Sequence, residues 1–155
     1  MSLPKVVSGL AMPAKGAAMD SYGRVHSYLR LSVTDRCNFR CIYCMPEEGM
    51  KWLHKERLLR FEEIHRVVRV MVNMGVRRVR LTGGEPLLRT ELTELVDLLA
   101  KIPDLDDLSM TTNGHLLTKY AARLAQAGLQ RVNVSLDSVD AEQFSRMTRG
   151  GDLKR

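Results

Sequence analysis

The chain has 155 residues, of which 45% are hydrophobic and 27% charged, a composition typical of a globular protein with one buried core. Its 24 basic and 18 acidic side chains give a net charge of +6, which suits anionic small molecules as well as nucleic acid. The sequence has no lysine-rich run, no basic patch interleaved with aromatic residues, and no apolar stretch of membrane-spanning length. We therefore expect neither a nucleic-acid partner nor a membrane partner.

The first 21 residues are expected to form a flexible arm. Small residues dominate this segment, and Gly9 and Pro13 interrupt its apolar part, which argues against a signal peptide. The segment up to Met19 contains no arginine, so a transit peptide is also poorly supported. Residues 22–155 are expected to form the folded domain.

Strands and helices alternate along the rest of the chain. The expected strands cover residues 28–33, 78–81, 108–111 and 131–136, and the expected helices cover residues 61–74, 91–101, 117–127 and 141–147. In the first helix, apolar residues recur with a helical period, Glu62 and Glu63 suit the positive N-terminus, and Arg60 is a weak cap. This alternation predicts βα units, a parallel sheet and an α/β fold.

All three cysteines lie in one loop directly after the first expected strand. Cys37, Cys41 and Cys44 follow the spacing C-x3-C-x2-C. Three thiolates this close can hold one corner of an iron–sulfur cube, which usually has four cysteine ligands, and leave one iron open. Spacing alone also allows a zinc site or a disulfide with one free thiol, although His54 is the nearest downstream histidine and has no second ligand beside it.

Polar residues follow the other three strands as well. The second strand ends in T-G-G-E-P, the third is followed by Asn113, and the fourth ends near Ser135 and Asp137. Because ligands bind at the carboxyl edge of parallel sheets, we expect the functional site there. We assign no role to Asn113 or Asp137.

Two strand arginines are candidates for binding an anion. Arg30 and Arg80 lie on two expected strands, where an unpaired arginine is costly to bury. They could converge with Thr111 on one ligand, and guanidinium groups suit triphosphate oxygens. A strand-end arginine that simply reaches solvent is the alternative for each one alone.

The cysteine loop and its flanks, R-L-S-V-T-D-R-C-N-F-R-C-I-Y-C-M-P followed by E-E-G-M, resemble the radical S-adenosylmethionine (SAM) superfamily and, within it, the GTP 3′,8-cyclase family of molybdenum-cofactor biosynthesis. The resemblance runs from about Tyr22 onward. It implies a partial TIM-type (β/α) barrel with about four βα units, and one 4Fe–4S cluster that binds SAM at its open iron. The implied cluster ligands are Cys37, Cys41 and Cys44, the SAM contacts are Tyr43, Gly84 and Ser135, and the GTP contacts are Arg30, Arg80 and Thr111.

The resemblance also implies a lyase reaction in which no side chain of the protein is itself the catalytic group. One electron, from a donor such as flavodoxin or ferredoxin, enters the cluster and cleaves SAM to a 5′-deoxyadenosyl radical. This radical takes hydrogen from the ribose 3′ carbon of GTP, and the sugar radical attacks C8 to give 3′,8-cyclo-7,8-dihydro-GTP. Because clustered, reduced cysteines are typical of an intracellular compartment, we expect a cytoplasmic protein.

The family that the chain resembles continues its barrel into a C-terminal region with three more cysteines and a second cluster. No cysteine follows Cys44 here, so we expect one cluster and no cyclised product from the chain as written. A half barrel also leaves its last strand unpaired, which favours homo-oligomers or aggregation. Two alternatives remain: another radical SAM enzyme, such as a peptide-modifying one, and a non-catalytic module that binds a cluster and SAM.

Overall fold

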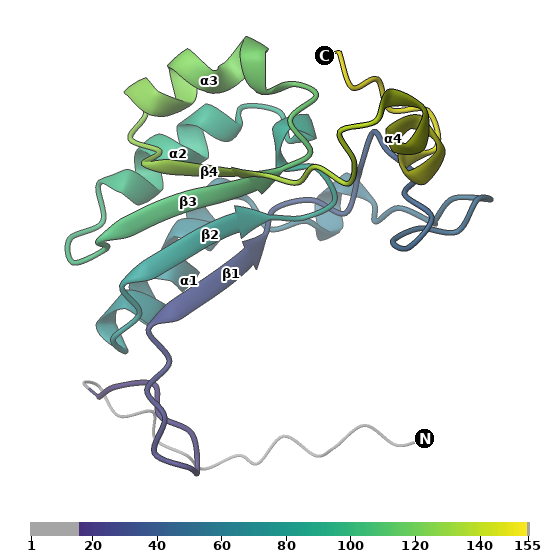
Figure 1. The fold of residues 1–155 in the computed structure, drawn as a ribbon. Helices are drawn as coiled ribbons and strands as arrows, with labels where there is room; N and C mark the ends of the chain where they lie inside the picture. Colours follow the sequence, from purple (N-terminus) through teal and green to yellow (C-terminus); the bar gives the residue numbers. More distant parts are fainter. Residues whose placement is uncertain (1–15, 155) are drawn as a thin grey trace.

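The structure is a computed structural model, and it describes residues 16–154. Four parallel strands form one sheet in chain order (Figure 1). The strands are β1 (Tyr28–Ser32), β2 (Arg78–Thr82), β3 (Asp107–Thr112) and β4 (Arg131–Val134). The helices are α1 (Phe61–Asn73), α2 (Leu92–Ala100), α3 (Leu117–Gln126) and α4 (Ala141–Thr148), with short 3-10 turns η1 (Lys55–Arg57) and η2 (Pro86–Leu88).

The α/β fold and the parallel sheet predicted from the sequence are confirmed, and each predicted strand and helix is present with ends that differ by one or two residues. The two 3-10 turns were not predicted. Each has only three residues, too few for a hydrophobic period to show in the sequence.

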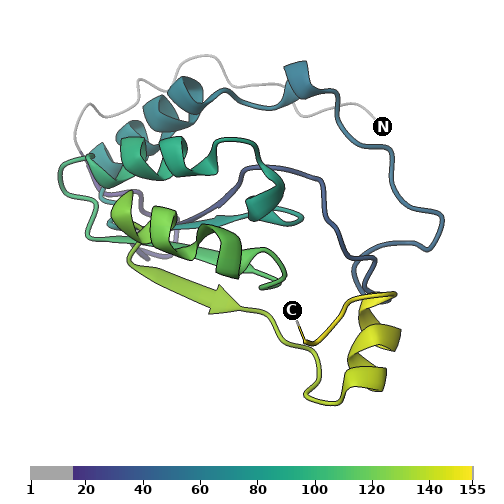
Figure 2. The same ribbon diagram turned by 90° about the horizontal axis from the view of Figure 1, so that it is seen from above.

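One face of the sheet carries the core. Helices α1, α2 and α3 cover this face (Figures 1 and 2), and buried strand residues such as Val79, Leu81 and Met110 pack against apolar helix residues such as Val68 and Leu95. Since side chains alternate across a strand, the residues between them point to the other face. Within residues 16–154 no helix layer covers that face, which carries the polar strand residues.

The first helix begins as its sequence suggests. The Arg60 backbone N–H donates to Glu63 Oε2 at 2.7 Å, which satisfies one N–H at the helix start without a Ser or Thr cap. This backbone hydrogen bond is the main reason that the pKa of Glu63 lies below its ordinary value. Gly75, with φ of 94°, follows the helix.

Residues 18–26 fold back on the connection between α1 and β2. The Ala18 N–H donates to Met74 O at 2.6 Å, and Met19 forms an isolated antiparallel bridge with Val25. Most of the predicted flexible arm, residues 1–15, lies outside the described residues. Its boundary at residue 21 therefore stays a prediction.

The last helix lies apart from the other three. Figures 1 and 2 show α4 beyond the carboxyl edge of the sheet, beside the loop that follows β1. Strand β4 forms one edge of the sheet, and Val134 on it is 51% exposed. Among residues 16–154, no helix combines the length and the apolar character needed to cross a bilayer.

Candidate functional site

The loop after β1 holds all three cysteines as free thiols. Cys37 and Cys41 are half-buried, and Cys44 is exposed. The backbone N–H of Cys44 donates to Cys41 O at 2.9 Å, so these two residues flank one tight turn. Cys37 is held at two atoms, because Arg40 Nη1 donates to its carbonyl oxygen at 2.8 Å and the Phe39 N–H donates to its Sγ at 3.4 Å.

The three thiols lie near one another. Burial is the main cause that raises the pKa of Cys37 and of Cys41. Cys44 raises the pKa of Cys37 further, after Glu85, and Cys37 and Cys44 raise the pKa of Cys41 further, after Asp137. Within residues 16–154, no three His, Cys, Asp or Glu side chains converge tightly enough to hold a single metal ion. Because each thiolate of an iron–sulfur cube binds a different iron, the thiols need only surround one corner, and this donor set fits that requirement.

Two glycines bring the end of β2 against the cysteine loop. Gly84 N donates to Thr34 O at 2.8 Å, and Glu85 N donates to Arg36 O at 2.7 Å. A Cβ on Gly83 would lie 2.4 Å from Thr34 O, and one on Gly84 would lie 2.3 Å from Arg36 O. The glycines are therefore needed for close contact with the backbone that leads to Cys37. The SAM contact expected at Gly84 stays a prediction.

Glu85, which the sequence analysis includes only as part of T-G-G-E-P and gives no role of its own, lies at the centre of this edge. Glu85 is only 1% exposed, and both of its carboxylate oxygens accept hydrogen bonds. Oε1 accepts from Leu87 N at 3.0 Å and from Thr112 Oγ1 at 2.7 Å, and Oε2 accepts from Asn113 N at 2.8 Å. Glu85 thus joins the loops after β2 and β3. The available sign was a charged residue placed between two glycines and a proline. This sign is weak, because a turn of that kind usually leaves its carboxylate in solvent.

The loop after β4 reaches the cysteine loop through Tyr43. The Tyr43 hydroxyl donates to Asp137 Oδ1 at 2.8 Å. Burial raises the pKa of Tyr43, and this hydrogen bond raises it further. Ser135 is exposed and continues the ladder by donating its N–H to Thr112 O at 2.8 Å. Tyr43 and Ser135 are therefore brought to the same edge of the sheet, and Asp137 acquires a partner.

Helix α4 holds the outer side of the cysteine loop. Two carbonyls at its C-terminus accept from loop N–H groups: Thr148 O from Arg40 N at 3.1 Å, and Met147 O from Ile42 N at 3.0 Å. Arg149 Nη1 donates to Met45 O at 3.2 Å. These contacts join residues about 100 positions apart, so no local pattern in the sequence indicates them.

The open face of the sheet carries a row of arginines. In the strand register Arg30 lies opposite Arg80, Arg80 opposite Ser109, and Ser109 opposite Arg131. Arg131 forms an ion pair with Asp107. The ion pairs of the described residues do not include Arg30 or Arg80, and Arg80 Nε is buried without a hydrogen-bond partner. Like charges opposite each other are unfavourable, so this pair suits an anionic ligand.

Thr111 lies near this row on the same face. It sits on β3 two residues beyond Ser109 and is paired in register with Asn133 of β4. The structure thus brings the three predicted GTP contacts to the open face of neighbouring strands. Their contact with GTP stays a prediction.

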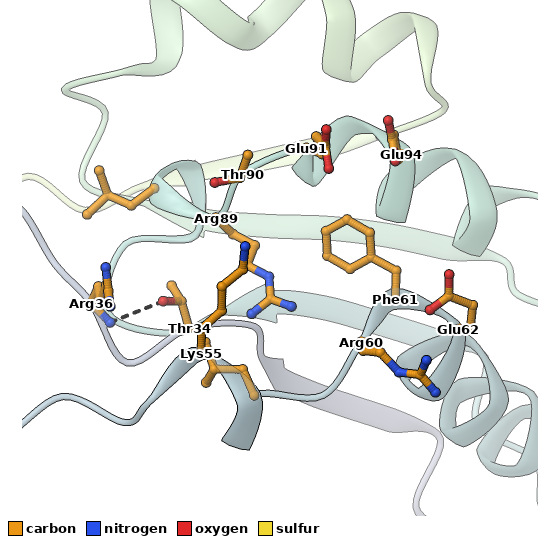
Figure 3. A pocket seen from close by; sticks show the side chains of 12 residues that line it. Thr34, Arg36, Lys55, Arg60, Phe61, Glu62, Arg89, Thr90, Glu91 and Glu94 are labelled. Atoms are coloured by element: carbon orange, nitrogen blue, oxygen red, sulfur yellow. Dashed lines mark hydrogen bonds between the residues drawn. The ribbon is translucent and has the colours of Figure 1, made fainter.

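A cavity of about 410 Å³ lies beside the segment that leads from β1 to Cys37 (Figure 3). Thr34 and Arg36 line one wall, and the starts of α1 and α2 line the others. Its side chains carry both charges: Arg36, Lys55, Arg60 and Arg89 against Glu62, Glu91 and Glu94. It includes none of the predicted site residues, which lie at the carboxyl edge and on the open face of the sheet.

Comparison with known proteins places this site in a family. The Radical SAM superfamily matches residues 31–155. The GTP 3′,8-cyclase of Listeria welshimeri is 54% identical over 136 residues, which are 88% of this chain and 41% of that protein. The GTP 3′,8-cyclase of Petrotoga mobilis is 50% identical over 137 residues, which are 88% of this chain and 42% of that protein. The chain spans about two-fifths of the length of these relatives.

Solved structures share the fold. Streptococcus suis SuiB bound to S-adenosylmethionine superposes with a TM-score of 0.60 at 18% identity, over 78% of this chain and 27% of that one. BtrN in complex with AdoMet and 2-DOIA superposes with a TM-score of 0.56 at 21% identity, over 76% of this chain and 48% of that one. At these identities the likeness concerns the fold alone, and it agrees with the predicted partial barrel.

Proposed function

The chain belongs to the radical SAM superfamily, and on that premise we propose that it provides the cluster-binding, SAM-binding and part of the GTP-binding site of a GTP 3′,8-cyclase. Members of this superfamily use a 4Fe–4S cluster and SAM. Residues 22–155 form the core domain in this proposal, and residues 1–21 form the arm. Identity of about 50% to named GTP 3′,8-cyclases supports the assignment.

The proposed role of each residue follows from its place at the carboxyl edge of the sheet. Cys37, Cys41 and Cys44 hold the cluster, while Tyr43, Gly84 and Ser135 contact SAM. When bound, the cluster and SAM supply the 5′-deoxyadenosyl radical, so the protein has to hold and orient its ligands rather than act as an acid or base. The hydrogen bonds of the Gly83–Glu85 segment and of α4 hold the cysteine loop from two sides.

One observation carries the choice of GTP as substrate. Arg30 and Arg80 lie directly opposite each other on the open face, and neither takes part in an ion pair of the described residues. A triphosphate would neutralise both guanidinium groups with charge-assisted hydrogen bonds. Thr111, on the next strand, would add a hydroxyl donor.

The proposal extends to partners and compartment. The cluster needs one electron at a time, which a flavodoxin or ferredoxin type of donor supplies. The exposed edge strand β4 favours a homo-oligomer. Three free thiols in one loop suit the reducing cytoplasm.

Calorimetric titration with GTP tests the substrate assignment. Arg30→Ala and Arg80→Ala should each weaken GTP binding by roughly tenfold or more, the effect of losing a hydrogen bond between charged groups of about 1.5–3 kcal/mol. Arg77→Ala is the matched control. Arg77 directly precedes β2, at the amino ends of the strands, and forms an ion pair with Asp104. Guanosine should bind far more weakly than GTP. Equal binding of guanosine and GTP, or equal loss in all three variants, would contradict the proposal.

A further inference from the structure

The buried residue Glu85 is linked by hydrogen bonds to both sequence neighbours of Cys37, directly to Arg36 and through Asn113 to Asn38. The backbone N–H of Glu85 donates to Arg36 O at 2.7 Å, which fixes the residue before Cys37. The carboxylate of Glu85 accepts from Asn113 N at 2.8 Å, and Asn113 Nδ2 donates to Asn38 Oδ1 at 2.9 Å, which fixes the residue after Cys37. Cys37 therefore lies between two residues whose positions both depend on Glu85.

The orientation of the Asn113 amide follows from a backbone donor. The His115 N–H donates to Asn113 Oδ1 at 3.1 Å. Because a backbone N–H can only donate, the amide oxygen of Asn113 must face its own loop, and its NH₂ group must face Asn38. Asn113 is thus held at three atoms: its backbone N–H by Glu85, its amide oxygen by the His115 N–H, and its amide nitrogen by Asn38 of the cysteine loop.

We propose that Asn113 is a positioning residue for Cys37, transmitting the fixed position of Glu85 to the cysteine loop through Asn38. Among the hydrogen bonds of residues 16–154, Asn113 makes none to a thiol, so it acts through its neighbour Asn38. The inference rests on the proposed function, because it gives Cys37 the part of a cluster ligand. Its first test nevertheless uses the metal-free protein, so that it does not depend on cluster, SAM or GTP.

The test is the rate at which iodoacetamide modifies each cysteine of the folded, metal-free chain, followed by mass spectrometry. Asn113→Ala should raise the rate at Cys37 by roughly two- to tenfold, the range that one neutral hydrogen bond contributes to a local opening equilibrium. Cys44, which is exposed, serves as the internal reference and should not change. Asn73→Ala, at the far end of α1, should leave every rate unchanged.

Changes at position 38 separate positioning from general loosening. Asn38→Ala removes the acceptor and should act like Asn113→Ala, whereas Asn38→Asp keeps an acceptor and should leave the Cys37 rate no faster than in the parent chain. The double variant Asn38→Ala with Asn113→Ala should be no faster than either single one, since both break the same contact.

Two results would overturn the proposal: a Cys37 rate that Asn113→Ala and Asn38→Ala leave unchanged, or an equal rise at all three cysteines with a lowered melting temperature. Failure of GTP to bind would leave this labelling pattern intact, so the two proposals fail separately. As a second readout, reconstituted Asn113→Ala should hold less iron per chain than the parent chain.

Discussion

Substitution of Gly84 by alanine tests how closely the end of β2 must approach the cysteine loop. An added Cβ would meet three backbone atoms at once: Arg36 O at 2.3 Å, Arg36 C at 2.6 Å and Asp35 O at 2.7 Å. Backbone atoms cannot rotate away as a side chain can, so the two segments must separate. Overpacking of this kind costs about 1–3 kcal/mol.

Separation would also break two hydrogen bonds, from Gly84 N to Thr34 O and from Glu85 N to Arg36 O. Each contributes about 1 kcal/mol, and alanine returns about 0.5–1 kcal/mol by stiffening the unfolded chain. We therefore expect Gly84→Ala to lower the free energy of unfolding by about 2–4 kcal/mol, measured by urea titration of the metal-free protein.

Gly49→Asn is the matched control. Gly49 has a φ of 84°, which asparagine tolerates, and an added Cβ would meet nothing within 4 Å. We expect this variant to change the free energy of unfolding by less than about 1 kcal/mol. If Gly84→Ala proved as stable as the control, the close approach of the two backbones would be wrong.

Three further predictions concern burial, charge and association. Glu85→Gln should lower the free energy of unfolding by about 1–3 kcal/mol in a urea titration, because the amide nitrogen cannot accept a hydrogen bond and one buried donor loses its partner. Glu48→Gln, on the surface, should have no effect. Equal stabilities of the two variants would show that the hydrogen bonds of Glu85 do not stabilise the fold. The pKa of Glu63 is lowered in the folded state, so its contribution is present at neutral pH and is lost as the pH falls below its ordinary value of 4.5. Melting temperatures from pH 7 to 3 should therefore fall less steeply for Glu63→Gln than for the parent chain, and parallel curves would contradict this. Sedimentation should show concentration-dependent association through the β4 edge, and a concentration-independent monomer would argue against it.

Much of the fold could be predicted because it depends on local patterns. The helical period of α1, the acidic residues Glu62 and Glu63 at its start, and the alternation of strands with helices are all visible in the sequence. The placement of the candidate site also follows from topology, since residues that end parallel strands meet at one edge.

The contacts that hold the cysteine loop could not be predicted in the same way. Asn38 and Asn113 are 75 residues apart, and Tyr43 and Asp137 are 94 residues apart. Such pairs leave no periodic trace, and a single asparagine or aspartate after a strand is equally consistent with a solvated turn. Glu85 was visible within T-G-G-E-P, but its burial depends on two other loops closing over it.

Anaerobic reconstitution with iron and sulfide tests whether the cysteine loop is a cluster site. We expect one redox-active, oxygen-labile 4Fe–4S cluster per chain, with an electron paramagnetic resonance spectrum in the reduced state that changes when SAM is added. Alanine at Cys37, Cys41 or Cys44 should abolish the cluster, and Glu48→Gln should not. A stable, redox-silent zinc site on the three thiols, or a cluster whose spectrum ignores SAM, would contradict it.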